Sequence, residues 1–197
     1  MRKLALLTSA CALIALANIA AAQQIDFTVG GSTLFSSAPI SASQAYPPPA
    51  EKGGTYPDAS VEVIFQNHFG FSAEGAFRYH DQLYNGFQRL RPVLYDVNGV
   101  FARRYSKRYA ADFMAGVGGE TLIFYNQPGS CNFPVCPTSI SGTHFLLHAG
   151  GGLRYYFWRS FFVRPEAHYY FVPNNFQFHS DSVLRLGASI GCTFGGK

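Results

Sequence analysis

The charged residues that could carry out chemistry are few, and most lie on one face of segments that alternate between polar and apolar residues. Charged side chains make up only 13% of the 197 residues. Acids and arginines occur together on that face, which is typical of paired charges inside a domain. The pattern therefore predicts a buried ion-pair network. Its expected members are Glu62, Glu74, Arg78, Asp112, Glu120, Arg154, Arg164, Glu166 and Arg185.

The histidines offer the most direct route to catalysis or metal binding. His144, His148 and His168 share the face of the charges, where hydrogen bonding within the network explains them. A metal site from His144 and His148 lacks a third ligand. In the His-Ser-Asp run at 179–181 the residues are adjacent, and adjacent residues of a strand point to opposite faces. We therefore expect no catalytic residue, no cofactor and no metal.

Three cysteines follow the N-terminal region. Cys131 and Cys136 enclose the turn-rich sequence CNFPVC. In a secreted chain such a pair is predicted to form a local disulfide that closes the loop. No histidine or acid lies beside the pair, which disfavours a metal site. Cys192 falls in the last apolar segment, where it serves as a small apolar side chain.

The N-terminus has the features of a secretory signal peptide. Arg2 and Lys3 precede an apolar core, and small residues end at Ala22. The core is too short to span a membrane comfortably, which disfavours an N-terminal anchor. We expect residues 1–22 to be removed and 23–197 to form one domain.

From Gln24 onward, apolar residues recur at every second position, the period of a half-buried β-strand. Turn residues separate successive segments, and no other apolar run approaches the roughly 20 residues that a membrane helix needs. Eight strands are expected, at 25–35, 61–65, 71–79, 93–101, 113–123, 145–155, 161–171 and 184–194.

Two all-β architectures fit these strands. A soluble, lipocalin-like periplasmic binding barrel turns its apolar face inward, whereas a membrane barrel turns that face toward lipid. The charged face is sparse and rich in glycine, for example Gly150 and Gly152, which suits a narrow interior. Aromatic residues at the strand ends, such as Tyr105, Tyr109 and Trp158, indicate interfacial girdles. The membrane barrel is favoured, and the soluble barrel stays open as an alternative.

The connections between the expected strands alternate in length. Outer-membrane barrels have long extracellular loops and short periplasmic turns, with both termini in the periplasm. Long polar links are expected at 36–58, 80–88, 126–142 and 173–180, and short ones at 67–70, 103–108 and 157–160.

The stretches GGGLRYYF at 150–157 and FVRPEAHYYF at 162–171 resemble the OmpA/OmpX-like outer membrane protein beta-barrel domain family, small eight-stranded barrels of the porin family. The last strand, RLGASIGCTF at 185–194, resembles the insertion signal read by the barrel-assembly machinery. The resemblance implies an all-β, eight-stranded antiparallel transmembrane up-and-down β-barrel in the bacterial outer membrane. Pro165 is an exception within it, because proline lacks a ladder hydrogen bond.

We expect a non-enzymatic envelope protein with a structural role or a binding role for its loops. Side chains fill an eight-stranded interior, so a wide pore is not expected. A membrane-embedded lipid-modifying enzyme or a narrow gated conduit remains the alternative. Expected partners are outer-membrane lipids, the barrel-assembly machinery during insertion and an unknown extracellular loop partner, but no nucleic acid. The basic turn of Arg103, Arg104, Lys107 and Arg108 is placed to contact anionic headgroups.

Overall fold

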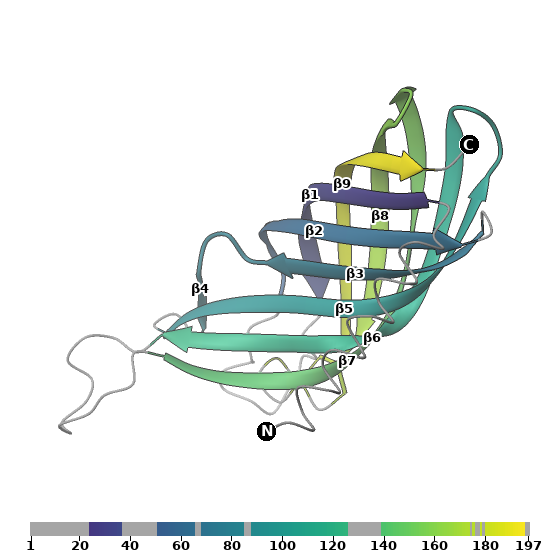
Figure 1. The fold of residues 1–197 in the computed structure, drawn as a ribbon. Coiled ribbons are helices and arrows are strands. Elements are labelled where there is room, and N and C mark those ends of the chain that lie inside the picture. Colours follow the sequence, from purple (N-terminus) through teal and green to yellow (C-terminus); the bar gives the residue numbers. More distant parts are fainter. Residues whose placement is uncertain are drawn as a thin grey trace, which may run out of the picture.

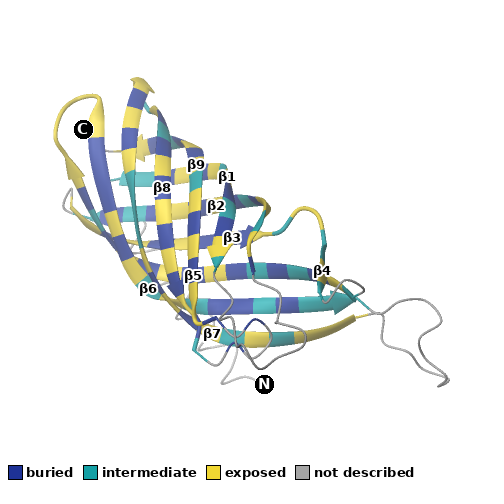
Figure 2. Cartoon of the chain, turned by 180° about the vertical axis from the view of Figure 1, so that it is seen from behind, coloured by how far each residue is buried: buried dark blue, intermediate teal, exposed yellow. Residues whose placement is uncertain are grey.

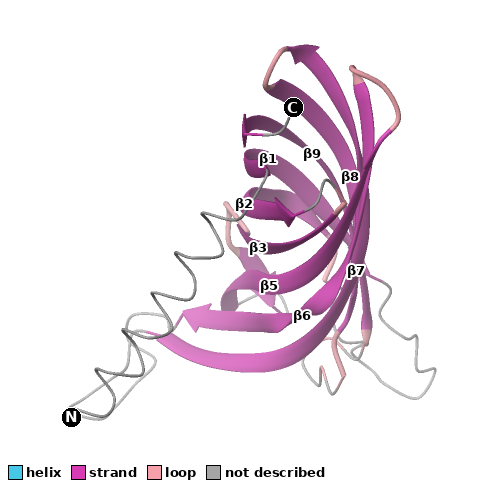
Figure 3. Ribbon diagram, turned by 45° about the vertical axis from the view of Figure 1, so that its right-hand side comes forward, coloured by secondary structure: helices cyan, strands magenta, loops and turns pink. Residues whose placement is uncertain are grey.

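The computed structural model describes residues 24–36, 51–65, 68–84, 88–125, 139–173, 175, 178 and 180–195. Over these residues the chain consists of β-strands joined by turns and loops, as Figure 3 shows. This part of the chain contains no helix that could cross a membrane. The expected signal peptide at 1–22 and the cysteines Cys131 and Cys136 lie outside the described residues.

The described strands form one antiparallel sheet that closes on itself (Figure 1). They are β1 (Gln24–Ser36), β2 (Gly53–Phe65), β3 (Phe69–Phe77), β4 (Gln82–Tyr84), β5 (Gln88–Arg104), β6 (Tyr109–Tyr125), β7 (Ser139–Trp158), β8 (Phe161–Phe171) and β9 (Ser182–Gly195). Neighbours in the chain pair along the sheet, β1 pairs with β9, and β3 pairs with β5. Eight strands therefore complete a barrel, and β4 lies outside the ring on the first residues of β5. The predicted fold class is confirmed.

The two ends of the barrel differ in the length of their connections. Short turns join β2 to β3, β5 to β6 and β7 to β8, and the outer ends of β1 and β9 at Gln24 and Gly195 lie with these turns. We call this the turn end. The longer connections, from β1 to β2, β3 to β5, β6 to β7 and β8 to β9, lie at the opposite end, which we call the loop end.

Several strands are longer than the sequence pattern predicts, chiefly at the loop end. β2 begins at Gly53, inside the expected loop 36–58, and β7 begins at Ser139, inside the expected loop 126–142. Apolar alternation detects only the belt that contacts lipid, whereas the hydrogen-bonded ladder continues through polar residues beyond it. The short strand β4 was not expected, and Tyr79, assigned to the third strand, lies beyond the end of β3.

Exposed and buried residues alternate along every strand of the barrel, as the bands in Figure 2 show. Large apolar side chains point outward, among them Phe71 at 64% exposure and Val97 at 59%. Arg154 and Arg164 point inward and are each 1% exposed. A water-soluble barrel would place these two classes the other way round. The outward apolar belt therefore excludes the soluble, lipocalin-like alternative and is that of a barrel that spans a membrane.

Pro165 lies at a gap in the ladder between β7 and β8. Gly152 pairs with Glu166 and Tyr155 pairs with Val163, whereas the register skips the intervening positions, including that of Pro165. On its other side Pro165 keeps its pairing with Ala188 of β9. A proline has no N–H to donate, so the barrel accommodates it by interrupting one ladder locally while the neighbouring ladder continues.

Candidate functional site: a polar layer inside the barrel

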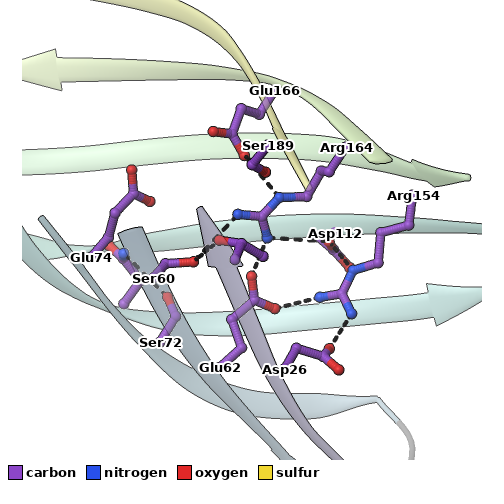
Figure 4. Close-up of polar contacts among 12 residues, drawn as sticks. Asp26, Ser60, Glu62, Ser72, Glu74, Asp112, Arg154, Arg164, Glu166 and Ser189 are labelled. Atoms are coloured by element: carbon purple, nitrogen blue, oxygen red, sulfur yellow. Dashed lines mark hydrogen bonds and ion pairs between the residues drawn. The ribbon is translucent and has the colours of Figure 1, made fainter. Parts of the chain in front are cut away.

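Arg154 is the centre of the polar layer toward the turn end. It lies on β7 and donates to carboxylates from three other strands: Asp26 of β1, Glu62 of β2 and Asp112 of β6 (Figure 4). The Arg154 Nε to Asp112 Oδ2 distance is 2.5 Å. The guanidinium also lies 5.0 Å from the ring centroid of Phe162. One side chain therefore ties four strands together across the barrel.

Arg164 on β8 extends the network around the wall. It shares Glu62 with Arg154, and its Nε donates to Glu166 Oε2 at 2.8 Å. Ser189 on β9 donates to the same Glu166 oxygen at 3.1 Å (Figure 4). Glu62 thus bridges two arginines, one through each of its oxygens. This geometry offsets the desolvation of the charges, because each guanidinium meets more than one carboxylate.

The long arginine side chains fit because β7 carries glycines beside them. A Cβ on Gly152 would lie 2.7 Å from Cγ of Arg164, and one on Gly150 would lie 2.8 Å from Nε2 of His148. Both contacts are closer than real side chains permit. Gly150 and Gly152 therefore leave the space that the network and His148 occupy, which accounts for glycine at these two inward positions.

Two stacked histidines continue the polar layer toward the loop end. Asn98 Nδ2 donates to Asp96 Oδ1 at 2.5 Å, so Asn98 Oδ1 faces His148 Nδ1 at 2.6 Å and accepts its proton. His148 Nε2 is then the acceptor for His168 Nδ1, at 3.0 Å. The remaining nitrogen, His168 Nε2, lies 3.7 Å from Glu166 Oε1. The hydrogen bonds therefore assign one tautomer to each ring and link both histidines to Asn98 on β5.

Arg185 and Glu74 form a separate buried pair that links β9 to β3. The Arg185 guanidinium lies 5.7 Å from the ring centroid of Tyr170. Nearby, Ser32 donates to Asp58 Oδ2 at 3.1 Å. These contacts bring the predicted residues Arg185 and Glu74 together, but with each other and not with Arg154 or Arg164.

Arg78 and Glu120, the remaining predicted members, lie apart from the arginine network. Arg78 donates to Gln82 Oε1 at 2.6 Å and to the carbonyl of His80 at 3.1 Å. Glu120 accepts from Asn175 Nδ2 at 3.1 Å, a contact that ties β6 to the connection between β8 and β9. Both residues therefore hold the loop end of the barrel together.

Glu51, which the sequence pattern did not single out, is buried against Glu120. Burial and the negative charge of Glu120 raise the pKa of Glu51 well above its ordinary value, although Arg78 opposes this shift. No donor among the described residues reaches either Glu51 oxygen. Burial next to another carboxyl group therefore favours the neutral, protonated form of Glu51.

Apolar side chains cover the polar layer on both sides. Toward the turn end lie two buried clusters, Ala110, Tyr156 and Phe162 in one and Ile64, Val100, Ala102 and Met114 in the other. Toward the loop end the covering cluster contains Leu34, Tyr56, Leu94, Leu146, Tyr170, Val172 and Val183, with Leu90, Leu122 and Phe178 beyond it. The arginine network therefore lies between apolar layers, and the buried carboxyl groups of Glu51 and Glu120 lie farther toward the loop end.

The described part of the chain shows no metal site, and Ser180 of the His-Ser-Asp run bonds to other serines. No group of three His, Cys, Asp or Glu side chains in the described part of the chain is arranged to hold a metal. Ser180 accepts from Ser36 at 3.0 Å and donates to the carbonyl of Ser182 at 3.2 Å. The contacts that the structure gives to Ser180 therefore tie down a loop.

Comparison with known proteins identifies the fold and no relative by sequence. No protein-family model matches the chain, and no curated protein matches it. The N-terminal β-barrel domain of OprF from Pseudomonas aeruginosa is similar in structure, with a TM-score of 0.59, 11% identity, and coverage of 88% of this chain and 98% of that domain. Ail, the attachment invasion locus protein of Yersinia pestis, gives 0.58 at 15% identity, covering 88% and 99%.

Neisserial surface protein A is also similar, with a TM-score of 0.56 at 9% identity, covering 88% of this chain and 96% of that one. The likeness spans almost the whole of each neighbour, and identities this low show a shared fold alone. The chain is a small outer-membrane β-barrel of eight strands.

Sequence reasoning missed several polar members of the layer. Asp96 and Asn98 lie on the inward face of β5. Ser60 accepts a hydrogen bond from Arg164, and Ser189 donates one to Glu166. Their position in the inward alternation was the available signal. Asp96 and Asp26, the partner of Arg154, are charged but were not among the predicted members, and the serines and Asn98 were not weighed because such residues also fit an ordinary lumen.

Proposed function

We propose that the protein is a non-enzymatic component of the bacterial cell envelope, with a structural role or a binding role carried by its loops. The observation that supports this most strongly is the filled interior. A layer of buried ion pairs crosses the barrel, and apolar clusters cover the layer on both sides. Such an interior stabilises a barrel and opposes the passage of polar solutes.

The energetics of the polar layer support a static role. Breaking one partner out of a buried pair costs about 3–5 kcal/mol, because a charge is left uncompensated. Arg154 meets three carboxylates, so opening a path would break several such contacts at once. A gate that opened by displacing Arg154 would therefore be costly.

A binding role, in this proposal, belongs to the loop end. Orientation follows the general rule that long loops are extracellular and short turns periplasmic. The loop end carries the extra strand β4 and the long connection from β6 to β7, which contains Cys131 and Cys136. The disulfide between these cysteines remains a prediction, and so does an extracellular partner.

The test combines gel mobility with conductance. The full-length chain is expressed in a Gram-negative host, and its outer-membrane fraction is run with and without boiling. We expect a mobility shift on heating, and no single-channel steps when the purified protein enters a planar lipid bilayer. Steady channels in the parent protein would contradict the filled interior and favour the narrow conduit.

A double variant provides the comparison that is needed if the parent protein forms no channels in the bilayer. Tyr156→Ala with Phe162→Ala removes the large side chains of one apolar cluster at the turn end. The double variant and the parent are both checked for insertion by their heat-modifiable mobility. Increased ion leakage through the variant alone would show that the cluster contributes to the seal. The enzyme alternative is tested separately, by mass spectrometry of the host's membrane lipids with and without expression, where any new modified species would contradict the proposal.

A further inference from the structure

The turn end carries a group of exposed cations without carboxylate partners. Arg103 and Arg104 end β5, and Lys107 and Arg108 follow in the turn to β6. The ion pairs among the described residues involve none of these four. The carboxylates nearest to them are buried inside the barrel, where they form ion pairs with Arg154 and Arg164. The outer rim is therefore left with a net positive charge.

The basic turn is held in a defined conformation. The Ser106 hydroxyl accepts from the backbone N–H of Arg108 at 3.2 Å and of Tyr109 at 3.1 Å. The Arg103 guanidinium lies 5.5 Å from the ring centroid of Tyr105, and that of Arg104 lies 4.5 Å from Tyr156. Arg103 and Arg104 thus rest on aromatic rings, which lowers the entropy lost when they bind an anion.

An apolar groove opens on the outer wall directly beside this turn. Its volume is about 560 Å³, and it crosses β3, β5 and β6. Phe69, Phe71, Phe101 and Phe113 form its walls, and Gly99 and Ala115 lie on its floor. The volume is within the range of about 300–1,000 Å³ that small-molecule sites occupy.

The strand register explains both the groove and its relation to the cations. Gly99 pairs with Phe71 on one side and Ala115 on the other, so two small residues leave a notch beside a phenylalanine. The next outward residues on β5 are Phe101 and then Arg103. At about 3.3 Å per residue, Arg103 lies roughly 13 Å along the strand from the floor of the notch. Apolar groove and cation therefore follow one another along the same outward face.

We propose that this face binds an anionic diacyl phospholipid, with one acyl chain in the groove over Gly99 and the phosphate at Arg103 and Lys107. A chain in lipid needs an apolar notch at the depth of the hydrocarbon, and a phosphate needs a cation at the level of the interface. The outward face of β5 supplies these two features in that order. The inference rests on the proposed orientation, which places the turn end at the inner leaflet.

The test reconstitutes the full-length processed protein in vesicles of equimolar phosphatidylglycerol and phosphatidylcholine with identical acyl chains. Native mass spectrometry of the extracted barrel then counts the lipids that remain bound. We expect the parent to retain phosphatidylglycerol in preference to phosphatidylcholine. Arg103→Gln should lower this preference about fivefold, the factor that corresponds to about 1 kcal/mol for one basic side chain at an anionic surface.

A second variant tests the groove independently of the charge. Gly99→Leu places a side chain in the notch, where the nearest atom to a new Cβ is the Ala115 carbonyl oxygen at 3.8 Å, so the barrel accommodates it. Retention of both lipids should fall several-fold, with their ratio unchanged. Gly75→Leu is the matched control, because Gly75 also faces outward with nothing within 4 Å of a Cβ. Arg159→Gln in the turn from β7 to β8 is the control for the charge.

The outcomes separate this inference from the proposed function. Absence of heat-modifiable mobility in the parent would overturn the membrane barrel itself. Normal mobility with equal retention of the two lipids would overturn only the phospholipid site. A preference that survives Arg103→Gln combined with Lys107→Gln, or retention that survives Gly99→Leu, would also overturn it, because the lipid would then be held elsewhere.

Discussion

The two charged regions inside the barrel are built in opposite ways. Toward the turn end, Arg154 and Arg164 draw carboxylates from several strands and share Glu62 between them. Toward the loop end, two carboxyl groups, Glu51 and Glu120, face each other. The first region compensates buried charge with opposite charge, whereas in the second the burial of two carboxyl groups together raises the pKa of Glu51.

This difference shows which part of the barrel keeps a fixed charge and which part responds to pH. An arginine keeps its charge at any physiological pH, so the region around Arg154 has one state. A buried carboxyl group with a raised pKa responds to pH, and Glu51 belongs to the connection that enters β2 at the loop end. The ion pairs near the turn end therefore keep their charge at physiological pH. The contact that holds the connection from β1 to β2 at the loop end changes with pH.

The largest expected effect is the loss of Arg154. Arg154→Ala leaves Asp26, Glu62 and Asp112 buried around a missing cation, although Arg164 still reaches Glu62. We expect the free energy of unfolding to fall by about 3–5 kcal/mol. Urea unfolding in phospholipid vesicles, followed by the fluorescence of Trp158, measures it. A loss below about 1 kcal/mol would mean that water already compensates these carboxylates.

Neutralising the shared carboxylate should cost less. Glu62→Gln keeps the size of the side chain, and both arginines retain other partners, Asp112 for Arg154 and Glu166 for Arg164. We expect a loss of about 1.5–3 kcal/mol, the contribution of hydrogen bonds to a charged group. The same unfolding measurement applies. An effect equal to that of Arg154→Ala would show that Glu62, and not Arg154, is the centre of the network.

The carboxyl pair at the loop end predicts a pH dependence of known sign. Because the folded pKa of Glu51 is raised, its contribution to stability is fully present below the ordinary glutamate pKa of about 4.3 and is lost as the pH rises through the raised value. Glu51→Gln donates to Glu120 at every pH, so the variant should lose this part of the dependence. Hydrogen exchange of the loop-end amides from pH 5 to pH 8 checks it. Identical pH profiles in parent and variant would contradict the raised pKa of Glu51.

The smallest effect is expected at an exposed pair of the loop end. Arg89 donates to Asp81 at 2.5 Å, but the arginine side chain is 64% exposed. Arg89→Ala should change the free energy of unfolding by about 1 kcal/mol or less, because solvent screens exposed ion pairs and Arg91 also reaches Asp81 at 2.8 Å. This variant is the matched control for Arg154→Ala. A comparable loss in both would refute the distinction between buried and exposed arginines.

Sequence alternation predicted most of the barrel wall and the face on which each charge lies. Phe71, Val97 and Ile190 face outward as expected, and Glu62, Arg154 and Arg164 face inward. Alternation succeeds here because a register slip of one residue would place arginines in lipid, which is far too costly. It failed at Gly53 and Ser139, where strands continue without an apolar belt.

The partners inside the barrel could not be predicted in the same way. Arg154 and Asp26 are distant in the chain, and only the closure of β1 onto β9 brings β1 to the level of β7. Glu120 was expected beside an arginine, but the tilt and register of the strands place it against Glu51 and Asn175. Which arginine pairs with which acid depends on the position of each residue along the barrel axis. The alternation of polar and apolar residues does not contain that position.

The sequence by itself determined the class of fold and the inside and outside of the wall, because a period of two together with the cost of burying charge in lipid allows one assignment of faces. Only the tertiary structure decided which charges meet, where apolar clusters cover them and where a groove lies beside the basic turn. These features depend on residues from strands far apart in the chain that reach the same height when the barrel closes.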